Sequence, residues 1–358
     1  METKTAHING ISGPFKVCAT LLALAASALA AASLGAGVAD GSGVPSSGRN
    51  YTRQELVNPA DTHRIRISYR SRTGAVRPAY VLVPRSYLHG PHSPLPLVIS
   101  PHGRGVSARV NAGRWGNLPG IGNFAVVSPA GLGEHLRLYS WGAEGQIEDL
   151  ARMPNIVTRS LPWLKIDRKR IYAFGGSMGG QETLLLAARH PRLLAGAAAM
   201  DSLVDFPLQY RNFPRIACKA SCRRTWGGPI GYSLQRFARR EVGGTPETAP
   251  SQYAARSPLN YAKNIARSCV PLQIWWSRND TTVVDSWKQS GRLFREIRKA
   301  NGRAPVAAYI GYWHHAKAFR AARYLPNALA RFGLMPPEFD QKPGRPTLIP
   351  PPAEACTR

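Results

Sequence analysis

A serine between paired glycines is the strongest chemical signal in this sequence. Residues 175–180 read Gly-Gly-Ser-Met-Gly-Gly, which places Ser177 after an apolar run at 170–174 and before another at 181–188. A serine on a tight turn from strand to helix has a strained backbone, and glycine at both flanks removes collisions with neighbouring strands. The pattern therefore predicts that Ser177 is a nucleophile. The alternative is a glycine-rich turn in which Ser177 only caps the helix.

Backbone amides that could hold a developing oxyanion are predicted at two places. Such a site needs one N–H group from the residue after the nucleophile and one from the loop after an earlier strand. Met178 supplies the first, and Arg104, within Pro-His-Gly-Arg-Gly at 101–105, supplies the second. We expect His102 to brace this loop through hydrogen bonds, with a catalytic role as the alternative.

The acid and the base that a nucleophilic serine needs are predicted downstream, in the chain order serine, acid, base. Asp280 follows a strand-like run and is the predicted acid, whereas Asp285 lies where a helix should begin and is predicted to cap it. Two adjacent histidines, His314 and His315, follow the last strand-like run. Both cannot face the serine. His315 is preferred as the base because it lies nearer the following helix, and His314 is the alternative.

The elements that must position these residues alternate between two hydrophobic periods. Strand-like runs lie at 64–69, 79–83, 95–100, 124–128, 170–174, 195–200, 272–276 and 305–310, and helix-like runs lie at 145–160, 178–190, 285–300 and 316–332. Strand pairs come first, and strand–helix alternation follows. This order predicts an α/β fold with a mostly parallel central sheet and helices on both faces.

The first 39 residues have the order of a secretory leader. Lys4 and Lys16 precede an unbroken run of small and apolar residues at 17–34, and a cleavage site follows at Ala39. An uncleaved anchor helix is the alternative, because about 18 residues can just span a bilayer. We expect a secreted, extracellular protein with no stable transmembrane segment after processing. The remaining domains are then predicted as follows: a flexible linker at 40–51, a catalytic domain at 52–335 and a proline-rich tail at 336–358 that runs extended over the surface.

Cysteine usage agrees with export. Cys218, Cys222, Cys269 and Cys356 remain after the leader is removed, and an even number in an exported chain favours two disulfides. The short spacing favours Cys218–Cys222, which leaves Cys269–Cys356, and zinc binding by the first pair is the alternative. That pair lies within 202–267, where no strand-like run occurs and where we expect a helical cap insertion.

The charge of the chain bears on its partners. The sequence holds 47 Lys and Arg against 20 Asp and Glu, a formal charge of +27. Such a surface attracts polyanions, so an anionic cell-surface polymer is a predicted partner. Nucleic acid is not, because Arg is spread along the chain without a reader motif. With 44% hydrophobic and only 19% charged residues, a wholly disordered chain and a coiled coil are both excluded.

Taken together, these motifs resemble the α/β-hydrolase superfamily, in particular secreted esterases, polyhydroxyalkanoate depolymerases and prolyl oligopeptidase-like catalytic domains. The resemblance spans about residues 52–332. It rests on Tyr-Val-Leu-Val-Pro at 80–84, the apolar run into His-Gly at 94–103, Gln-x-x-Asp at 146–149, the glycine-flanked serine and Asp-x-x-Val at 280–283. The histidine loop departs from the pattern, since it reads Tyr-Trp-His-His where many relatives have Gly-His.

The resemblance implies a secreted serine hydrolase that uses no metal or organic cofactor. We expect a carboxylic-ester hydrolase with an aryl, acetyl-sugar or polyester substrate, in which Ser177 attacks, His315 takes its proton and Asp280 orients His315. A prolyl oligopeptidase-like serine peptidase is the first alternative, and a non-catalytic basic binding protein on the same fold is the second. Five aromatic residues either line a substrate groove or are buried structural groups: Trp115, Tyr139, Trp141, Trp226 and Trp313.

Overall fold

The computed structural model describes residues 50–90, 92–216, 230–340 and 346–357. The predicted leader, the predicted linker up to residue 49 and the Cys218–Cys222 pair lie outside these ranges. Within them, none of the helices combines the length and the apolar character that a membrane span requires.

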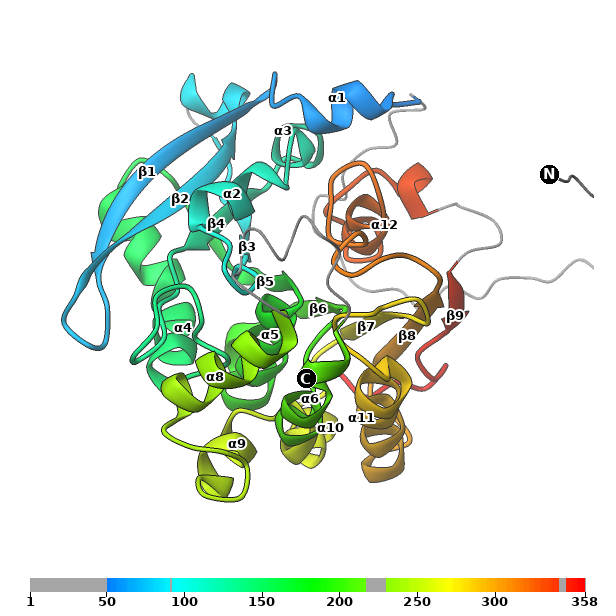
Figure 1. Ribbon diagram of the computed structural model, residues 1–358. Coiled ribbons are helices and arrows are strands. Elements are labelled where there is room, and N and C mark those ends of the chain that lie inside the picture. Colours follow the sequence, from blue (N-terminus) through cyan, green and yellow to red (C-terminus); the bar gives the residue numbers. More distant parts are fainter. Residues whose placement is uncertain (1–49, 91, 217–229, 341–345, 358) are drawn as a thin grey trace, which may run out of the picture. The chain divides into compact units, whose positions relative to one another are not determined.

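A nine-stranded sheet forms the centre of the described chain, with strand order β1-β2-β4-β3-β5-β6-β7-β8-β9 (Figure 1). The strands are β1 (Thr62–Arg70), β2 (Val76–Pro84), β3 (Leu95–Ile99), β4 (Ala125–Pro129), β5 (Ile166–Gly176), β6 (Gly196–Met200), β7 (Leu272–Ser277), β8 (Val306–Gly311) and β9 (Thr347–Ile349). The pairs β1/β2, β2/β4 and β8/β9 are antiparallel, and the pairs between them in the sheet are parallel. The predicted α/β architecture with a mostly parallel sheet is confirmed.

Burial along the strands follows from this arrangement. β3 and β4 are buried at every position, as expected of parallel strands that are covered on both faces. β1, at the edge, alternates between buried and exposed side chains.

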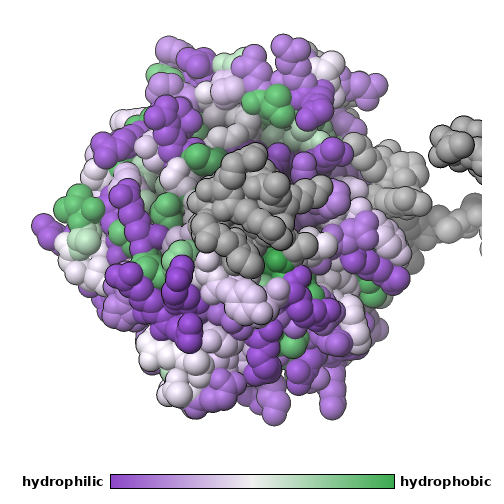
Figure 2. Space-filling model, in the orientation of Figure 1, coloured by the Kyte–Doolittle hydropathy of each residue, from purple (hydrophilic) through white to green (hydrophobic). Residues whose placement is uncertain are grey.

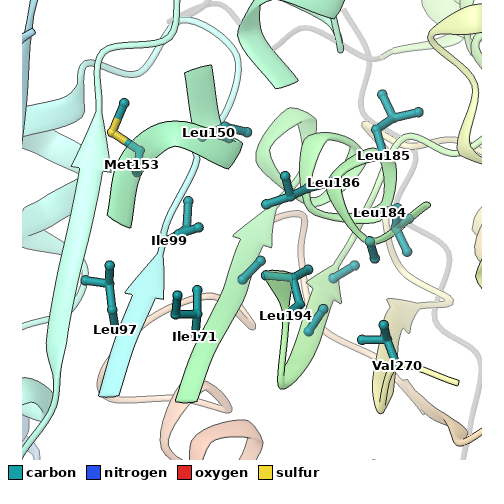
Figure 3. Packing of buried hydrophobic residues seen from close by; sticks show 14 of the residues in the cluster. Leu97, Ile99, Leu150, Met153, Ile171, Leu184, Leu185, Leu186, Leu194 and Val270 are labelled. Atoms are coloured by element: carbon teal, nitrogen blue, oxygen red, sulfur yellow. The ribbon is translucent and has the colours of Figure 1, made fainter. Parts of the chain in front are cut away.

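Helices cover both faces of the sheet (Figure 1). One face carries α4 (Glu144–Ser160), α5 (Met178–Arg189), α10 (Ala262–Ser268) and α11 (Ser286–Ala300), and the other carries α2 (Ala108–Gly113), α3 (Leu118–Gly122) and α12 (Leu325–Ala330). Figure 3 shows the first layer from close by, where Leu97, Ile99 and Ile171 of the strands lie beside Leu150 and Met153 of α4. The apolar side chains that recur along one side of α4 thus pack against a continuous apolar face of the sheet.

The remaining described helices are α1 (Arg53–Val57), α6 (Phe206–Asn212), α8 (Ile230–Val242) and α9 (Pro250–Ala255). Five 3₁₀ turns lie at Arg85–Leu88, Pro191–Leu193, Phe213–Arg215, Pro258–Tyr261 and Pro337–Asp340. The described part of residues 202–267 is therefore helical. Its apolar side chains form a cluster with Trp141 and Met178, which places this segment next to the turn at Ser177.

A buried carboxylate ties this helical segment to the loop after β4. Glu241 of α8 is fully buried and accepts hydrogen bonds from the backbone N–H groups of Glu134, His135 and Leu136 at 2.6 to 2.9 Å. Arg256 lies 3.7 Å from the same carboxylate. These polar contacts and the apolar cluster together hold α8 in place.

The prediction of a helix at 316–332 is wrong for the first half of that range. Only α12 (Leu325–Ala330) forms there, because Ala316 has φ 56° and its N–H group donates to Asp201 at 3.0 Å. A residue at φ 56° lies outside the right-handed helical region, so an α-helix cannot run through Ala316. The apolar residues that imitated a helical period, including Ala318 and Phe319, are buried from a loop.

The described part of the tail at 346–357 contacts the rest of the fold at two places. β9 (Thr347–Ile349) adds to the sheet edge by pairing with β8, and Cys356 forms a disulfide with Cys269. The backbone N–H group of Cys356 donates to the carbonyl of Arg303 at 2.7 Å. The tail is thus held at both its strand and its disulfide.

Candidate active site

Ser177 occupies the turn between β5 and α5 in a strained backbone conformation. Its φ is 60° and its ψ is −124°, and its N–H group donates to the carbonyl of Met200 at 2.9 Å. The flanking glycines are required by close backbone contacts. A Cβ on Gly175 would lie 2.2 Å from the carbonyl oxygen of Gly179, and a Cβ on Gly179 would lie 2.3 Å from that of Pro101. The geometry is that of a strand–turn–helix nucleophile elbow.

His315 lies between Ser177 and Asp280. Its Nε2 is 2.9 Å from the Ser177 hydroxyl oxygen, and its Nδ1 is 2.8 Å from Oδ2 of Asp280. The structure therefore brings together three residues that are 138 and 35 positions apart in the chain. The arrangement matches a serine with a base in hydrogen-bond reach and a carboxylate that orients the base.

The carboxylate of Asp280 is itself fixed by the loop after β7. Its Oδ1 accepts hydrogen bonds from the backbone N–H groups of Thr282 at 2.8 Å and Val283 at 2.9 Å. Its side chain is fully buried, so Oδ2 is left to face His315. A carboxylate in this setting holds one tautomer of the imidazole, with the proton on Nδ1.

Opposing effects act on the charge of His315. Burial lowers the pKa of His315, but the carboxylates of Asp280 and then of Asp201 raise it, and the net pKa lies above its ordinary value. The positive charge of Arg104 acts in the lowering direction. The imidazolium is therefore stabilised overall, which suits a base that must carry a proton between two steps.

Asp201 is a site residue that the sequence reasoning missed. It follows directly after β6, is fully buried, and accepts hydrogen bonds from Trp313 Nε1 at 2.8 and 3.0 Å and from the N–H group of Ala316 at 3.0 Å. These two donors flank His315 in the chain. Burial, with Asp280 next, raises the pKa of Asp201 to about 7. The signal that could have found it is its position immediately after a buried strand, at the edge where the other site residues gather.

The predicted oxyanion loop packs against the serine turn. A Cβ on Gly103 would lie 3.7 Å from the carbonyl oxygen of Gly176 and 3.9 Å from the Cβ of Ser177. Arg104 follows Gly103 directly, and Met178 begins α5 directly after Ser177. Both predicted amide donors are therefore neighbours of the serine.

His102 lies where the bracing interpretation placed it. It is fully buried, and its two ring nitrogens are 2.9 Å from the carbonyl of Gly103 and 2.8 Å from that of Gly131. Burial lowers the pKa of His102. With both nitrogens at backbone carbonyls, the ring links the oxyanion loop to the loop after β4.

Two other residues of the sequence analysis fall outside the triad geometry. His314 is exposed and makes its contact through its carbonyl, which accepts from the N–H group of Lys317 at 3.0 Å. Asp285 stands before α11 but does not cap it with its side chain. Its carboxylate instead lies 2.9 Å from Nη1 of Arg215 and 3.6 Å from Nζ of Lys288. The predicted capping role of Asp285 is wrong because these two cations attract its carboxylate away from the helix end.

Of the two interpretations of the aromatic residues, a substrate groove or buried structural groups, burial favours the second for three of them. Trp115, Trp141 and Trp313 are buried, and Trp226 lies outside the described residues. Tyr139 is half-buried beside Trp141, with ring centroids 5.5 Å apart. Trp313 serves the site as a hydrogen-bond donor to Asp201, a role that its burial requires of an indole N–H group.

Asp201, Asp280 and His315 also form a cluster whose ligand-type atoms lie within 4.8 Å of one another. Such a set could in principle hold a metal ion. The oxygens of Asp201 are already taken by Trp313 and Ala316, and the oxygens of Asp280 by the loop and by His315. Hydrogen bonding thus accounts for the geometry, and the donor set does not fit a metal.

The helix that follows Ser177 carries a further buried carboxyl group. Glu182 of α5 is fully buried, accepts from the hydroxyl of Ser140 and lies 3.5 Å from Nε2 of Gln146. Burial raises the pKa of Glu182 to about 7. This group connects α5 to α4 and to the loop after β4.

The strand order and the elbow define the α/β-hydrolase fold, and solved structures agree. Over 76% of its length the chain is similar to an acylaminoacyl peptidase from Pyrococcus horikoshii (TM-score 0.55, 16% identity) and an S-formylglutathione hydrolase from Agrobacterium tumefaciens (TM-score 0.54, 14% identity). A bacterial brefeldin A esterase gives a TM-score of 0.51 at 19% identity, also over 76% of the chain. The match covers 95% of the S-formylglutathione hydrolase and 74% of the esterase, but only 41% of the peptidase.

No protein-family model matches the chain, and no curated protein matches it in sequence. At these identities the structural likeness establishes the fold. The chain therefore has the α/β-hydrolase fold, as its motifs predicted.

Proposed function

We propose that this chain is a serine hydrolase that cleaves carboxylic esters through an acyl-enzyme. The observation that carries the proposal is the hydrogen-bonded line from Asp280 through His315 to Ser177, with 2.8 and 2.9 Å between the heavy atoms. A serine hydroxyl is a weak nucleophile until a base in hydrogen-bond reach can remove its proton. The strained turn at Ser177 supports the same role, because strain of this kind clusters at functional sites.

The steps follow from these positions. The Ser177 oxygen attacks the acyl carbon while its proton moves to Nε2 of His315, and Asp280 stabilises the imidazolium from the Nδ1 side. The amides of Met178 and Arg104 hold the oxyanion. His315 then gives its proton to the leaving alcohol. A water molecule, deprotonated by the same histidine, cleaves the acyl-enzyme and restores the serine.

Peptide bonds are the alternative substrate, because amide cleavage uses the same groups in the same order. The neighbours on this fold include an acylaminoacyl peptidase as well as an esterase and an S-formylglutathione hydrolase. A panel of aryl, acetyl-sugar, polyester and peptide substrates separates the two. Turnover of peptides with none of the esters would replace the ester assignment.

Labelling with a serine-directed fluorophosphonate tests the proposal most directly. The probe should modify Ser177, and Ser177→Ala should lose the label and lower hydrolysis of a simple aryl ester by about 10³-fold or more. Ser86→Ala, at an exposed serine in the turn after β2, is the matched control and should keep both. A folded wild-type protein that takes no label would favour a non-catalytic binding protein on this fold.

We further propose that the protein is exported and loses its first 39 residues. Support comes from the leader pattern and from the Cys269–Cys356 disulfide, since such bonds persist in oxidising compartments. The mass of the protein recovered from a culture supernatant should correspond to a chain that begins at Asp40.

A further inference from the structure

A cavity of about 420 Å³ is lined by positively charged side chains next to the oxyanion loop. Its cationic residues come from α1, the end of α2 and the loop after His315, and they are Arg53, Arg114, Lys317, Arg320 and Arg323. Among the described residues that line it, none carries a carboxylate. The remaining lining is small or apolar and includes the exposed side chains of Val57 and Val110.

Arg114 connects this cavity to the serine turn. Its carbonyl accepts a hydrogen bond from the N–H group of Ala321 at 3.0 Å, which ties the end of α2 to the loop after His315. Its Nη1 lies 3.9 Å from the point where a Cβ on Gly103 would stand, and the Cβ of Ser177 lies 3.9 Å from that same point. The guanidinium of Arg114 and the Cβ of Ser177 therefore both lie close to Gly103.

Among the described residues, no ion pair compensates the charge of Arg114. Burial lowers the pKa of Arg114, and the positive charge of Arg320 lowers it further. No acidic side chain of the described residues lies within 4.0 Å of either guanidinium. Two neighbouring guanidinium groups that repel each other, one of them half-buried, constitute a site that an anion would stabilise.

Arg256 shows what a compensated arginine looks like in the same molecule. It is buried, and its guanidinium lies 3.4 Å from Glu134, 3.7 Å from Glu241 and 2.8 Å from the carbonyl of Ser140. Arg114 has no comparable acidic partner among the described residues. This contrast makes Arg114 the candidate in this molecule for pairing with an added anion.

We propose that this cavity binds a carboxylate of the substrate, so that the enzyme acts preferentially on esters that carry a carboxylate beyond the scissile bond. The inference rests on the proposed ester hydrolysis and names its substrate class. The guanidinium fork fits the two oxygens of a carboxylate in a bidentate manner. The exposed Lys317, Arg320 and Arg323 extend the positive field outward from Arg114, which would draw an anionic ester towards the serine.

The test compares two esters with the same leaving group and acyl chain length, the 4-nitrophenyl monoester of adipic acid and 4-nitrophenyl hexanoate. At low salt the wild-type kcat/KM should favour the adipate monoester by about 10-fold. Arg114→Gln and Arg320→Gln should each lower this ratio several-fold, whereas Arg114→Lys should retain part of it. Arg66→Gln, at an exposed arginine on β1, is the control and should leave the ratio unchanged. A second pair, 3-carboxy-4-nitrophenyl acetate and 4-nitrophenyl acetate, places the carboxylate on the leaving group.

A preference for the neutral ester in both pairs, or a ratio that Arg114→Gln and Arg320→Gln leave unchanged, overturns the inference while the ester-hydrolase proposal stands. A measurement without turnover separates the two proposals further. Adipate should bind the wild-type protein in a calorimeter, and the binding should weaken several-fold in Arg114→Gln but not in Arg66→Gln. If no ester is hydrolysed but adipate binds in this pattern, the proposal of ester hydrolysis is wrong and the proposal that the cavity binds a carboxylate is supported. If adipate does not bind, the cavity assignment is wrong.

Discussion

The serine turn and the histidine loop meet at the hydrogen bond between Ser177 and His315, but different kinds of contact hold each of them in place. The turn at Ser177 is built by its immediate neighbours, since Gly175 and Gly179 are the residues whose missing side chains let the backbone close. The loop that carries His315 is built by distant groups. Asp201 holds Trp313 and Ala316 on either side of it, and Ser277 donates to the carbonyl of Trp313.

The turn and the loop should therefore respond differently to substitution. A turn held by backbone sterics fails when a single methyl group is added, because the contacts it meets are main-chain atoms. A loop held by buried hydrogen bonds can shift when one acceptor is altered, because its backbone has other conformations open to it.

Removal of the base gives the largest effect. His315→Ala should lower kcat for an aryl ester by about 10³-fold or more, because the serine loses the group that takes its proton. His314→Ala is the adjacent control, and since His314 is exposed and outside the triad its kcat should stay within about 2-fold of wild type. Equal and mild losses in both variants would contradict the geometry proposed for the loop.

A methyl group on the serine turn gives the next effect. Gly179→Ala places a Cβ 2.3 Å from the carbonyl oxygen of Pro101, so we expect it to destabilise the fold by about 2 kcal/mol or more in denaturant unfolding. Gly145→Ala stands at the same second position of its own helix, α4, where the new Cβ meets an ordinary contact at 3.9 Å. That variant should be neutral or stabilising by up to about 1 kcal/mol. A stable Gly179→Ala would show that the turn is not sterically closed.

Asp201→Asn tests the histidine loop. An amide in place of the carboxylate turns an NH₂ group towards either Trp313 or Ala316, so kcat should fall by about 10-fold as His315 loses its position. Asp201 also raises the pKa of His315, so its removal should move the acid limb of the kcat/KM profile to lower pH.

The sign of that shift separates positioning from general damage. Activity needs the neutral imidazole, and the raised pKa of His315 places the wild-type acid limb above the ordinary histidine value of about 6.5. A loss of kcat in Asp201→Asn with an unmoved acid limb would mean that Asp201 acts only through packing.

A rise in salt concentration should have the smallest effect on catalysis by the serine turn and the histidine loop. Among the coloured residues on the visible face, hydrophilic ones are the most widespread (Figure 2). The formal charge of the chain is +27. Retention on an anionic resin should therefore be lost between 0.05 and 1 M salt, where the screening length falls to about 3 Å. Turnover of neutral 4-nitrophenyl hexanoate should change less than about 2-fold over this range, because the Asp280–His315–Ser177 line is shielded from bulk ions. A parallel fall of turnover and retention would show that exposed charge contributes to the chemistry itself.

Several features of this protein were determined by its sequence alone. The turn at Ser177, the bracing of His102 and the mostly parallel sheet with helices on both faces could be predicted because glycine sterics and hydrophobic periods act over a few residues. The choice between His314 and His315, the contribution of Asp201 and the partial loss of the helix at 316–332 depended on contacts more than 100 residues apart, as the 115 positions between Asp201 and Ala316 illustrate. The presence of Arg114 and Arg320 in the lining of one cavity is of the same kind. Only the tertiary structure decided these, because the free energy of a buried carboxylate or an unpaired guanidinium depends on which groups the fold brings next to it.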